Sequence, residues 1–381
     1  MKLTILGATG SIGASTVDLV LRHPERFCVH ALVGHKNWQR MASLVKQVRP
    51  ECVVMTDESA ARQLKASLPA EVRLHVGMDA AIAAASESSV DMVMAAMVGS
   101  VGLPAALAAV RAGKRVGLAN KECLVTAGQI FMADAIDFGA DIVPVDSEHA
   151  AVHQALKGHD YHSIRRMILT ASGGPFRKTR LEDLQKVTPA QAIAHPNWDM
   201  GAKISVDSAT MMNKALELIE ARWLFDMAPE KLHAVIHPQS IIHAMVEYED
   251  GSVLAQLAEP DMRIPIAYAL MPETRIASGA NWLDLSISRS LDLIPIDEER
   301  FPALRLVREV MRGGHDLAVV MNAANEVANQ AFRDEKIAFM QIVATVEKVL
   351  EQVPTMAVDT LDSIMLCDAE ARRVAQRIIG L

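Results

Sequence analysis

LTILGATGSIG, residues 3–13, passes from an apolar run into a turn with Gly7, Gly10 and Gly13 in the spacing GxxGxxG. The residues that follow, ASTVDLVLRH, have the pattern of a helix. Glycine lets the backbone approach a pyrophosphate, whose charge the amides at a helix N-terminus then stabilise. The segment therefore predicts a nucleotide-binding strand, turn and helix. A tight packing turn without a ligand is the alternative interpretation.

The next apolar run, residues 29–33, indicates which nucleotide would bind. An NAD enzyme usually carries Asp or Glu after this strand, to hold the ribose 2′-hydroxyl. This chain has His35, Lys36, Asn37 and Arg40 instead. Cations and hydrogen-bond donors favour a 2′-phosphate, so we expect NADP rather than NAD, although the same residues would suit an ordinary surface.

Short apolar runs alternate with amphipathic stretches over the first part of the chain, at residues 3–6, 29–33, 52–55, 92–97, 116–119 and 142–145. This alternation predicts an α/β fold with a Rossmann-like doubly wound sheet over residues 1–150. We expect a central α+β catalytic domain over 151–271, with a hairpin turn at Asp250-Gly251. A proline-containing linker over 272–297 and a small helical domain over 298–381, interrupted at Gly313-Gly314, complete the prediction.

Composition excludes several classes of protein. Hydrophobic residues make up 51% of the chain, so it is expected to fold throughout, and the net charge of −8 argues against general nucleic-acid binding. The cysteines, Cys28, Cys52, Cys123 and Cys367, form no CxxC pair, which suits a reducing compartment and excludes a cysteine zinc site. No apolar run is long enough to span a membrane. We therefore expect a cytoplasmic protein without a membrane partner.

VDSEHAAVH, residues 145–153, places two acids on either side of a serine. Alternate residues share a face at the end of a strand but not on a helix, so we interpret Asp146 and Glu148 as lying at a strand end. Two acids on one face indicate a cation. The alternative is a pair of solvated acids that cap the following helix.

The stretch SVDSATMMNKALELIEARWLF, residues 205–225, predicts a helix that is capped near Asp207 or Ser208. Helical spacing puts Asn213, Lys214 and Glu217 near one face. With Asp146 and Glu148, Glu217 would complete an all-oxygen set suited to Mg²⁺ or Mn²⁺. Glu220 is a rival for the third ligand, and a Lys-Glu surface pair is the alternative for Lys214 and Glu217.

Two loops have the character of an anion-binding site. TASGGPF, residues 170–176, offers the Ser172 hydroxyl and flexible backbone amides, and Ser208, Asn213 and Lys214 offer donors for the other side of such a pocket. HPNWDMGAK, residues 195–203, resembles a mobile lid with Trp198 as a shield against water. Plain packing is the alternative for Trp198, and a structural role is the alternative for His195.

With these residues assembled, the chain closely resembles the 1-deoxy-D-xylulose 5-phosphate reductoisomerase family. The matching stretches occur in all the expected domains: GATGSIG, ANKECLV, PVDSEH, SGGPFR, HPNWDMGAKISVDSATMMNKALELIEARWLF, IHPQSIIHAMVEYEDGSVLAQL, EPDMR and NAANEVA. The resemblance implies NADPH contacts at Thr9, Gly10, Ser11, Ile12, Lys36, Asn37, Asn120, Glu122 and Gly201, and the charge of His35 makes it a further candidate beside Lys36. It implies metal ligation by Asp146, Glu148 and Glu217, which favours Glu217 over Glu220. It implies substrate contacts at Lys121, Ser147, Glu148, Ser172, His195, Ser208, Asn213, Lys214 and Glu217, with catalytic roles for Lys121, Glu148 and His195.

The resemblance also implies a reaction. The family rearranges 1-deoxy-D-xylulose 5-phosphate, by a retro-aldol and aldol route or an α-ketol shift, and NADPH reduces the resulting aldehyde to 2-C-methyl-D-erythritol 4-phosphate. This reaction belongs to non-mevalonate isoprenoid biosynthesis. A bound divalent ion would act as a Lewis acid, and a small phosphorylated substrate and a homodimer are the expected partners.

The chain departs from the family pattern at two positions. His35 stands where glycine is frequent, which puts that cofactor contact in doubt, and Cys123 replaces a serine, which we interpret as a small buried substitute. A catalytic thiol at Cys123 would instead indicate an NADP-dependent reductase of acyl phosphates or thioesters. A protein that senses NADP without catalysis is the other alternative.

Overall fold

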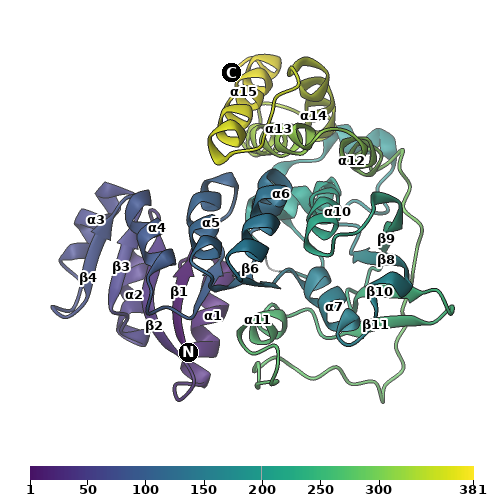
Figure 1. The fold of residues 1–381 in the computed structure, drawn as a ribbon. Helices are drawn as coiled ribbons and strands as arrows, with labels where there is room; N and C mark the ends of the chain where they lie inside the picture. The colour runs from purple at the N-terminus through teal and green to yellow at the C-terminus, as the bar shows by residue number, and fades with distance from the viewer. Residues whose placement is uncertain (199) are drawn as a thin grey trace. The chain divides into compact units, whose positions relative to one another are not determined.

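The computed structural model describes residues 1–198 and 200–381, which form two compact units (Figure 1). Unit 1 comprises Met1–Cys123, Phe131–Ala150 and Asp261–Asn281, and unit 2 comprises Leu124–Ile130, Ala151–Pro260 and Trp282–Leu381. The expected α/β class is confirmed. The expected four-part division into domains stays a prediction.

Unit 1 is built on a seven-stranded sheet in the order β4-β3-β2-β1-β5-β6-β7. All of its strand pairs are parallel. The strands are β1 (Lys2–Leu6), β2 (Cys28–Gly34), β3 (Cys52–Met55), β4 (Arg73–Val76), β5 (Met92–Ala95), β6 (Arg115–Leu118) and β7 (Asp141–Pro144). The order reverses beside β1, as in a doubly wound sheet, and such a reversal opens a ligand-binding crevice at the carboxyl ends of the strands.

Helices between these strands, together with the later helix α11, cover a continuous apolar core. They are α1 (Ser11–Arg22), α2 (Trp38–Val48), α3 (Glu58–Lys65), α4 (Met78–Ser86), α5 (Leu103–Arg111) and α11 (Arg263–Leu270). Leu3, Ile5 and Leu32 from the strands pack with Leu19 from α1 and are each 0% exposed. The apolar runs therefore form strands because both of their faces are buried.

Two helices contain residues of both units. They are α6 (Glu122–Asp137) and α7 (Ser147–Leu156). α6 contains a break at Ala127, where φ is −130° and ψ is 19°.

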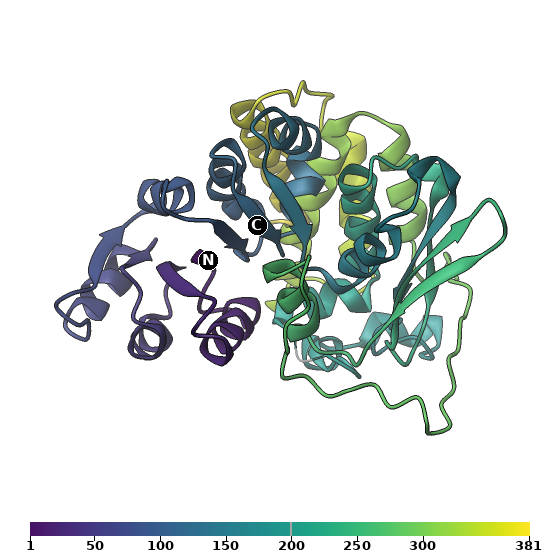
Figure 2. The same ribbon diagram turned by 60° about the horizontal axis from the view of Figure 1, so that its bottom comes forward.

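Unit 2 contains a four-stranded sheet in the order β11-β10-β8-β9. Its strands are β8 (Ile164–Ala171), β9 (Leu232–Ile236), β10 (Ile242–Tyr248) and β11 (Val253–Leu257). β10 pairs antiparallel with β8 and β11, whereas β8 and β9 are parallel. The predicted hairpin is confirmed, and its two long strands are visible in Figure 2. In its turn Gly251 has φ 86°, and the Asp250 carboxylate accepts the Ser252 amide at 2.8 Å.

The helix expected over residues 205–225 is instead two helices, so the predicted cap near Asp207 or Ser208 is wrong. α9 (Ala202–Ala209) runs through both residues, and α10 (Met212–Leu224) begins after a turn at Met211. Met211 has φ 60°, which no helical residue adopts. A short helix, α8 (Pro189–Ile193), precedes them.

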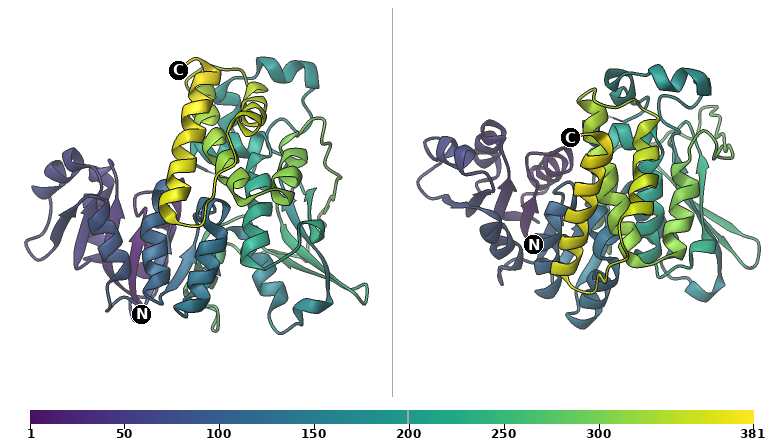
Figure 3. Two further views of the ribbon diagram at one scale, coloured as in Figure 1. Left: turned by 45° about the horizontal axis from the view of Figure 1, so that its top comes forward. Right: turned by 90° about the horizontal axis from the view of Figure 1, so that it is seen from above.

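The C-terminal part of unit 2 is helical, as predicted. Its helices are α12 (Ala303–Arg312), α13 (His315–Arg333), α14 (Gln341–Gln352) and α15 (Leu361–Ile379), of which the last three pack side by side (Figure 3). The expected break is confirmed, because Gly313 ends α12 and Gly314 caps α13. Among the described residues, no helix combines the length and apolar character needed to cross a membrane.

Candidate active site

The predicted site residues of unit 1 follow the carboxyl ends of four strands. Residues 9–12 follow β1, residues 35–37 follow β2, residues 120–122 follow β6 and residues 146–148 follow β7. Because parallel strands share an edge for their carboxyl ends, this arrangement has the character of a ligand site.

The three glycines of the first turn have different roles. Gly7 has φ +77°, and a Cβ there would lie 2.3 Å from the Ala96 oxygen; a Cβ on Gly13 would lie 2.5 Å from Ala8 Cα. Packing alone therefore requires Gly7 and Gly13. Gly10 is exposed and has more room, because a Cβ there would approach only the Gly7 oxygen, at 3.3 Å. It occupies the N-cap position of α1, where no side chain accepts a hydrogen bond from the first amides of the helix. An exposed helix start with a small residue and no side-chain cap fits a pyrophosphate.

The loop after β2 presents polar side chains to solvent. His35 Nδ1 lies 2.9 Å from Thr56 Oγ1, and Asn37 caps α2 by accepting the Arg40 amide at 3.1 Å. His35, Lys36 and Asn37 are all exposed. An exposed group of this composition fits a phosphate better than a ribose hydroxyl.

Asn120 and Lys121, at the end of β6, are both nearly buried. The Asn120 amide donates to the carbonyls of Met97 and Gly99, the latter at 3.0 Å, so it fixes the loop after β5. Lys121 is 8% exposed, and its Nζ lies 2.7 Å from Asp146 Oδ2. A buried ammonium beside a carboxylate is poised to balance charge there.

The two acids after β7 do not lie in a strand, so the strand-end interpretation is wrong. β7 ends at Pro144, and Glu148 belongs to the first turn of α7. Asp146 Oδ1 accepts the Glu148 amide at 3.2 Å and lies 3.1 Å from His149 Nδ1. The helix start therefore brings the acids together. Of the alternative interpretation, the helix cap is confirmed for Asp146, but the acids are not fully solvated: both are partly buried, and the Asp146 side chain is 12% exposed.

On α10 of unit 2, the predicted face is confirmed. Asn213 donates to one oxygen of Glu217 and Lys214 donates to the other. The side chains of Lys214 and Glu217 are 3% and 1% exposed, so the surface-pair alternative is wrong. Taking two charges out of water is costly, so a buried pair of opposite charges in this position indicates a functional site.

Ser172 and His195 form a hydrogen-bonded pair with a defined tautomer. His195 Nδ1 accepts the backbone amides of Asn197 and Trp198, at 3.2 and 3.0 Å, so the proton of the neutral ring lies on Nε2. Nε2 lies 2.8 Å from Ser172 Oγ, which also accepts the Gly174 amide at 3.1 Å. With both lone pairs of Oγ engaged, the Ser172 hydroxyl is left to donate outward, as an anion site requires.

Burial lowers the pKa of His195 to about 4. Unfolding exposes the ring, whose pKa then returns to about 6.5, so the unfolded chain binds the extra proton. The stability contributed by neutral His195 is therefore present above pH 6.5 and is lost as pH falls towards 4. We expect the free energy of unfolding to drop between pH 6.5 and 5 by at most about 2 kcal/mol more in the wild type than in His195→Gln. Urea denaturation at both pH values measures this, and equal drops would contradict it.

Asn197 was missed by the sequence analysis. Its amide donates to the Pro238 carbonyl at 2.7 Å and to Ser240 Oγ at 2.8 Å, which ties the His195 loop to the turn after β9. Trp198 is half-buried, with its ring 6.2 Å from that of His243. The expected lid continues through Asp199, which lies outside the described residues. The sequence did offer a signal for this role, because asparagine side chains often form hydrogen bonds to backbone groups in turns, and Asn197 lies in such a segment between Pro196 and Trp198.

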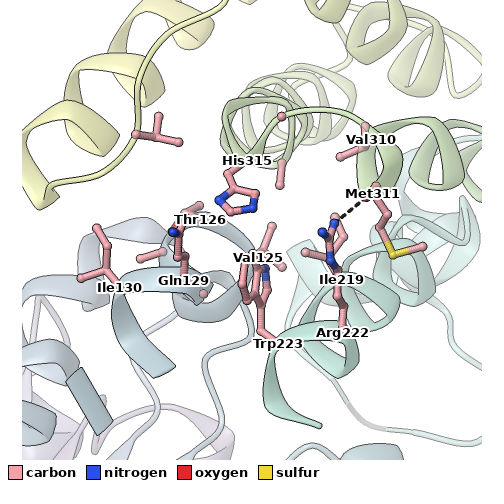
Figure 4. A pocket seen from close by; sticks show the side chains of 15 residues that line it. Val125, Thr126, Gln129, Ile130, Ile219, Arg222, Trp223, Val310, Met311 and His315 are labelled. Carbon is pink, nitrogen blue, oxygen red and sulfur yellow. Dashed lines mark hydrogen bonds between the residues drawn. The ribbon is translucent and has the colours of Figure 1, made fainter. Parts of the chain in front are cut away.

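Unit 2 also contains a pocket whose lining includes none of the predicted site residues (Figure 4). It encloses about 400 Å³ including its open mouth, between α6, α10 and the start of α13. The Trp223 ring packs against Gly128, where a Cβ would lie 2.2 Å from it, and edge-on to His315 at 4.8 Å. Figure 4 shows the side chains of Trp223, Arg222 and His315 close together, so we interpret this pocket as a place where helices pack and not as a ligand site.

Family models match most of the chain. A model described as 1-deoxy-D-xylulose 5-phosphate reductoisomerase matches residues 3–128. A model of its C-terminal domain matches residues 142–225, and one described as the DXP reductoisomerase C-terminal domain matches residues 257–374.

Curated relatives and solved structures agree with these matches. The 1-deoxy-D-xylulose 5-phosphate reductoisomerase of Cellvibrio japonicus (strain Ueda107) is 49% identical over 391 residues, covering 100% of this chain and 98% of that protein. The enzyme of the same name from Ectopseudomonas mendocina (strain ymp) is 52% identical, covering 98% and 97%. A crystal structure of DOX-P reductoisomerase with NADPH, fosmidomycin and magnesium has a TM-score of 0.95 at 40% identity, covering 100% and 98%. The Zymomonas mobilis enzyme in complex with NADPH has a TM-score of 0.92 at 45% identity, covering 99% and 98%.

Proposed function

The chain belongs to the 1-deoxy-D-xylulose 5-phosphate reductoisomerase family, and on this premise we propose that it converts 1-deoxy-D-xylulose 5-phosphate to 2-C-methyl-D-erythritol 4-phosphate. It is an NADPH- and divalent-metal-dependent enzyme of non-mevalonate isoprenoid biosynthesis. The observation that carries the proposal is the 49% identity along essentially the whole of both chains.

NADPH, when bound, supplies the hydride for the reduction step. We propose that its pyrophosphate lies at the start of α1, against Thr9, Gly10, Ser11 and Ile12, and that residues 35–37 hold its 2′-phosphate. The exposed, uncapped helix start at Gly10 supports this assignment. Asn120, Glu122 and Gly201 are the other proposed contacts. Asn120 acts there by fixing the loop after β5 as well.

A divalent ion, when bound, polarises the substrate carbonyl as a Lewis acid. We propose Asp146, Glu148 and Glu217 as its ligands, because carboxylate oxygens suit Mg²⁺ and Mn²⁺. Lys121, whose ammonium lies 2.7 Å from Asp146, balances charge and transfers a proton as the carbon skeleton rearranges. The Ser147 hydroxyl donates to Glu148 and so orients that carboxylate.

The substrate phosphate is proposed to bind the donors of unit 2. Ser172 offers its hydroxyl proton, and His195 orients that hydroxyl through Nε2. Ser208, Asn213 and Lys214 supply further donors. Fixing the non-reacting phosphate in this way converts binding energy into positioning of the reacting carbons.

We also propose that the enzyme is a cytoplasmic homodimer. Val253 and Leu254 on the edge strand β11 are 49% and 38% exposed, which supports contact with a second copy. The proposed domains are a nucleotide-binding domain at 1–150, a catalytic domain at 151–271, a linker at 272–297 and a helical domain at 298–381.

Metal removal tests the proposed function. NADPH oxidation should require 1-deoxy-D-xylulose 5-phosphate, should fall by at least about a hundredfold after dialysis against EDTA and should return on addition of Mn²⁺ or Mg²⁺. A spectrophotometric assay at 340 nm measures this. An untreated enzyme that oxidises no NADPH with this substrate would favour a nucleotide sensor instead.

Cys123→Ala is expected to keep kcat within about threefold of the wild type. Cys123 is 0% exposed, so its thiol is not accessible to a substrate as a nucleophile must be. A thioester-forming reductase would lose its nucleophile and all turnover in this variant. Steady-state kinetics with the purified variant therefore separates the two enzyme classes.

A further inference from the structure

The α9–α10 elbow, defined here as residues 207–214, joins two helices that both carry proposed substrate contacts. Ser208 lies near the end of α9 and Asn213 near the start of α10. Between them Met211 has φ 60° and ψ 11° and is only 1% exposed. A methionine rarely adopts this left-handed conformation, which persists only where surrounding contacts fix it.

Local hydrogen bonds supply part of that constraint. The Thr210 hydroxyl is within donating distance of the carbonyls of Val206 and Asp207, each at 3.2 Å. The same oxygen accepts a hydrogen bond from the Met212 amide at 3.3 Å. The Met211 amide donates to the Ser208 carbonyl at 3.1 Å. These bonds attach the turn to the end of α9, so the position of α9 sets the position of the whole elbow.

Asp207 anchors α9 from inside unit 2. Its side chain is 2% exposed, and its Oδ2 lies 2.9 Å from Lys203 Nζ, one helical turn earlier. Its Oδ1 accepts the side-chain amides of Asn325 and Asn329, at 2.9 and 2.8 Å. A buried carboxylate is stable only with such partners, so removing one of them leaves charge incompletely solvated.

Both amides come from α13, more than a hundred residues later in the chain. Asn325 and Asn329 are one turn apart and therefore face the same side. The Asn329 Nδ2 also donates to the Lys203 carbonyl at 2.9 Å, while its oxygen accepts Arg333 Nε at 2.9 Å. Arg333 thus fixes the orientation of the amide, and α13 is bound to both the backbone and the carboxylate of α9.

The Ser172 loop packs against the same helix end. Gly174 has φ +65°, and a Cβ there would lie 2.9 Å from Ala209 Cα and 3.0 Å from the Ser208 oxygen. A shift of α9 would therefore displace the loop that carries Ser172 together with the elbow.

We propose that Asn325 and Asn329 are positioning residues for substrate binding, acting through Asp207 on the α9–α10 elbow and the Ser172 loop. The inference rests on the proposed function, since it assigns Ser172, Ser208 and Asn213 to the substrate. The two amides touch no substrate. They keep the proposed phosphate donors at fixed distances from one another, and a small displacement of such donors weakens substrate binding strongly.

Asn325→Leu and Asn329→Leu test this, with Asn322→Leu as the matched control. Asn322 lies on the same helix and is also 0% exposed, but its amide donates to Glu326 at 3.3 Å. We expect the two test variants to raise KM for 1-deoxy-D-xylulose 5-phosphate by at least about tenfold, and to leave the NADPH dissociation constant, measured by fluorescence, within about twofold. The control should change Tm but not KM. A test variant whose KM rises no more than that of the control would overturn the proposal.

A smaller polar substitution tests the same contact if the leucine variants do not fold. Asn325→Ser removes the amide that donates to Asp207 and should raise KM for the sugar phosphate by at least about tenfold, whereas Asn322→Ser, its matched control, should leave KM within about threefold of the wild type. An Asn325→Ser enzyme whose KM rises no more than that of Asn322→Ser would sink the proposal. A wild-type enzyme without turnover of this substrate would refute the proposed function, whereas wild-type turnover with unchanged KM in the variants refutes the positioning role alone.

Discussion

Glu217→Gln is expected to lower kcat by about a thousandfold, equivalent to about 4 kcal/mol of transition-state stabilisation, while NADPH affinity stays unchanged. The substitution keeps the shape of a side chain that is 1% exposed but removes its charge. The proposed cation loses a charged ligand, whereas none of the proposed NADPH contacts is changed. Lys214 also loses its carboxylate partner, so a small fall in Tm is expected as well. Steady-state kinetics and NADPH fluorescence titration measure the two quantities.

Glu220→Gln is the matched control for this prediction. Glu220 is another buried acid on α10, 0% exposed, and was the rival ligand in the sequence analysis. The control should bind Mn²⁺ as the wild type does, whereas Glu217→Gln should bind it at least about tenfold more weakly. The opposite pattern would assign the ligand to Glu220, and normal kcat in Glu217→Gln would remove that residue from the metal site.

Lys121→Met should lower kcat by about 10² to 10⁴, the range typical of a positioned acid or base. Lys121 is 8% exposed and pairs with Asp146 at 2.7 Å, so the substitution removes a charge that water does not replace. Because a competing cation is lost beside a proposed metal ligand, Mn²⁺ affinity should stay equal or rise. A low kcat with undiminished Mn²⁺ affinity distinguishes this variant from Glu217→Gln, in which both should fall. Steady-state kinetics measures kcat, and Mn²⁺ titration measures the affinity.

Lys36→Met is the control cation on the nucleotide side. Lys36 is exposed, so its loss should raise KM for NADPH and leave kcat near normal. A Lys121→Met enzyme with normal kcat, or one whose only defect is weaker NADPH binding, would contradict the catalytic role.

Most of the parallel sheet could be predicted from the sequence, because strands buried on both faces appear as apolar runs. β4 could not, since RLHV is a sheet edge whose residues are largely exposed. The same reasoning put Asp146 and Glu148 at a strand end, whereas a cap interaction with the Glu148 amide begins α7 there. Local side-chain bonds of this kind have no periodic signal.

The candidate site was predictable where spacing alone brings residues together. Asn213 and Glu217 meet because helical periodicity requires it. The break at Met211 was not predictable, since no glycine or proline marks it, and the bonds from Ser208 and Thr210 that hold the turn have no periodic signal. The bonds from Asn325 and Asn329 to Asp207 are long-range, and no local pattern encodes them.

In the proposed function, Asp146 and Glu148 at the start of α7 and Glu217 on α10 hold one divalent cation. Crystals soaked in Mn²⁺ and measured at a wavelength where manganese scatters anomalously test it most directly. We expect an anomalous peak within about 2.0–2.3 Å of carboxylate oxygens of Asp146, Glu148 and Glu217. The absence of a peak among these side chains, in a crystal that still binds NADPH, would contradict it.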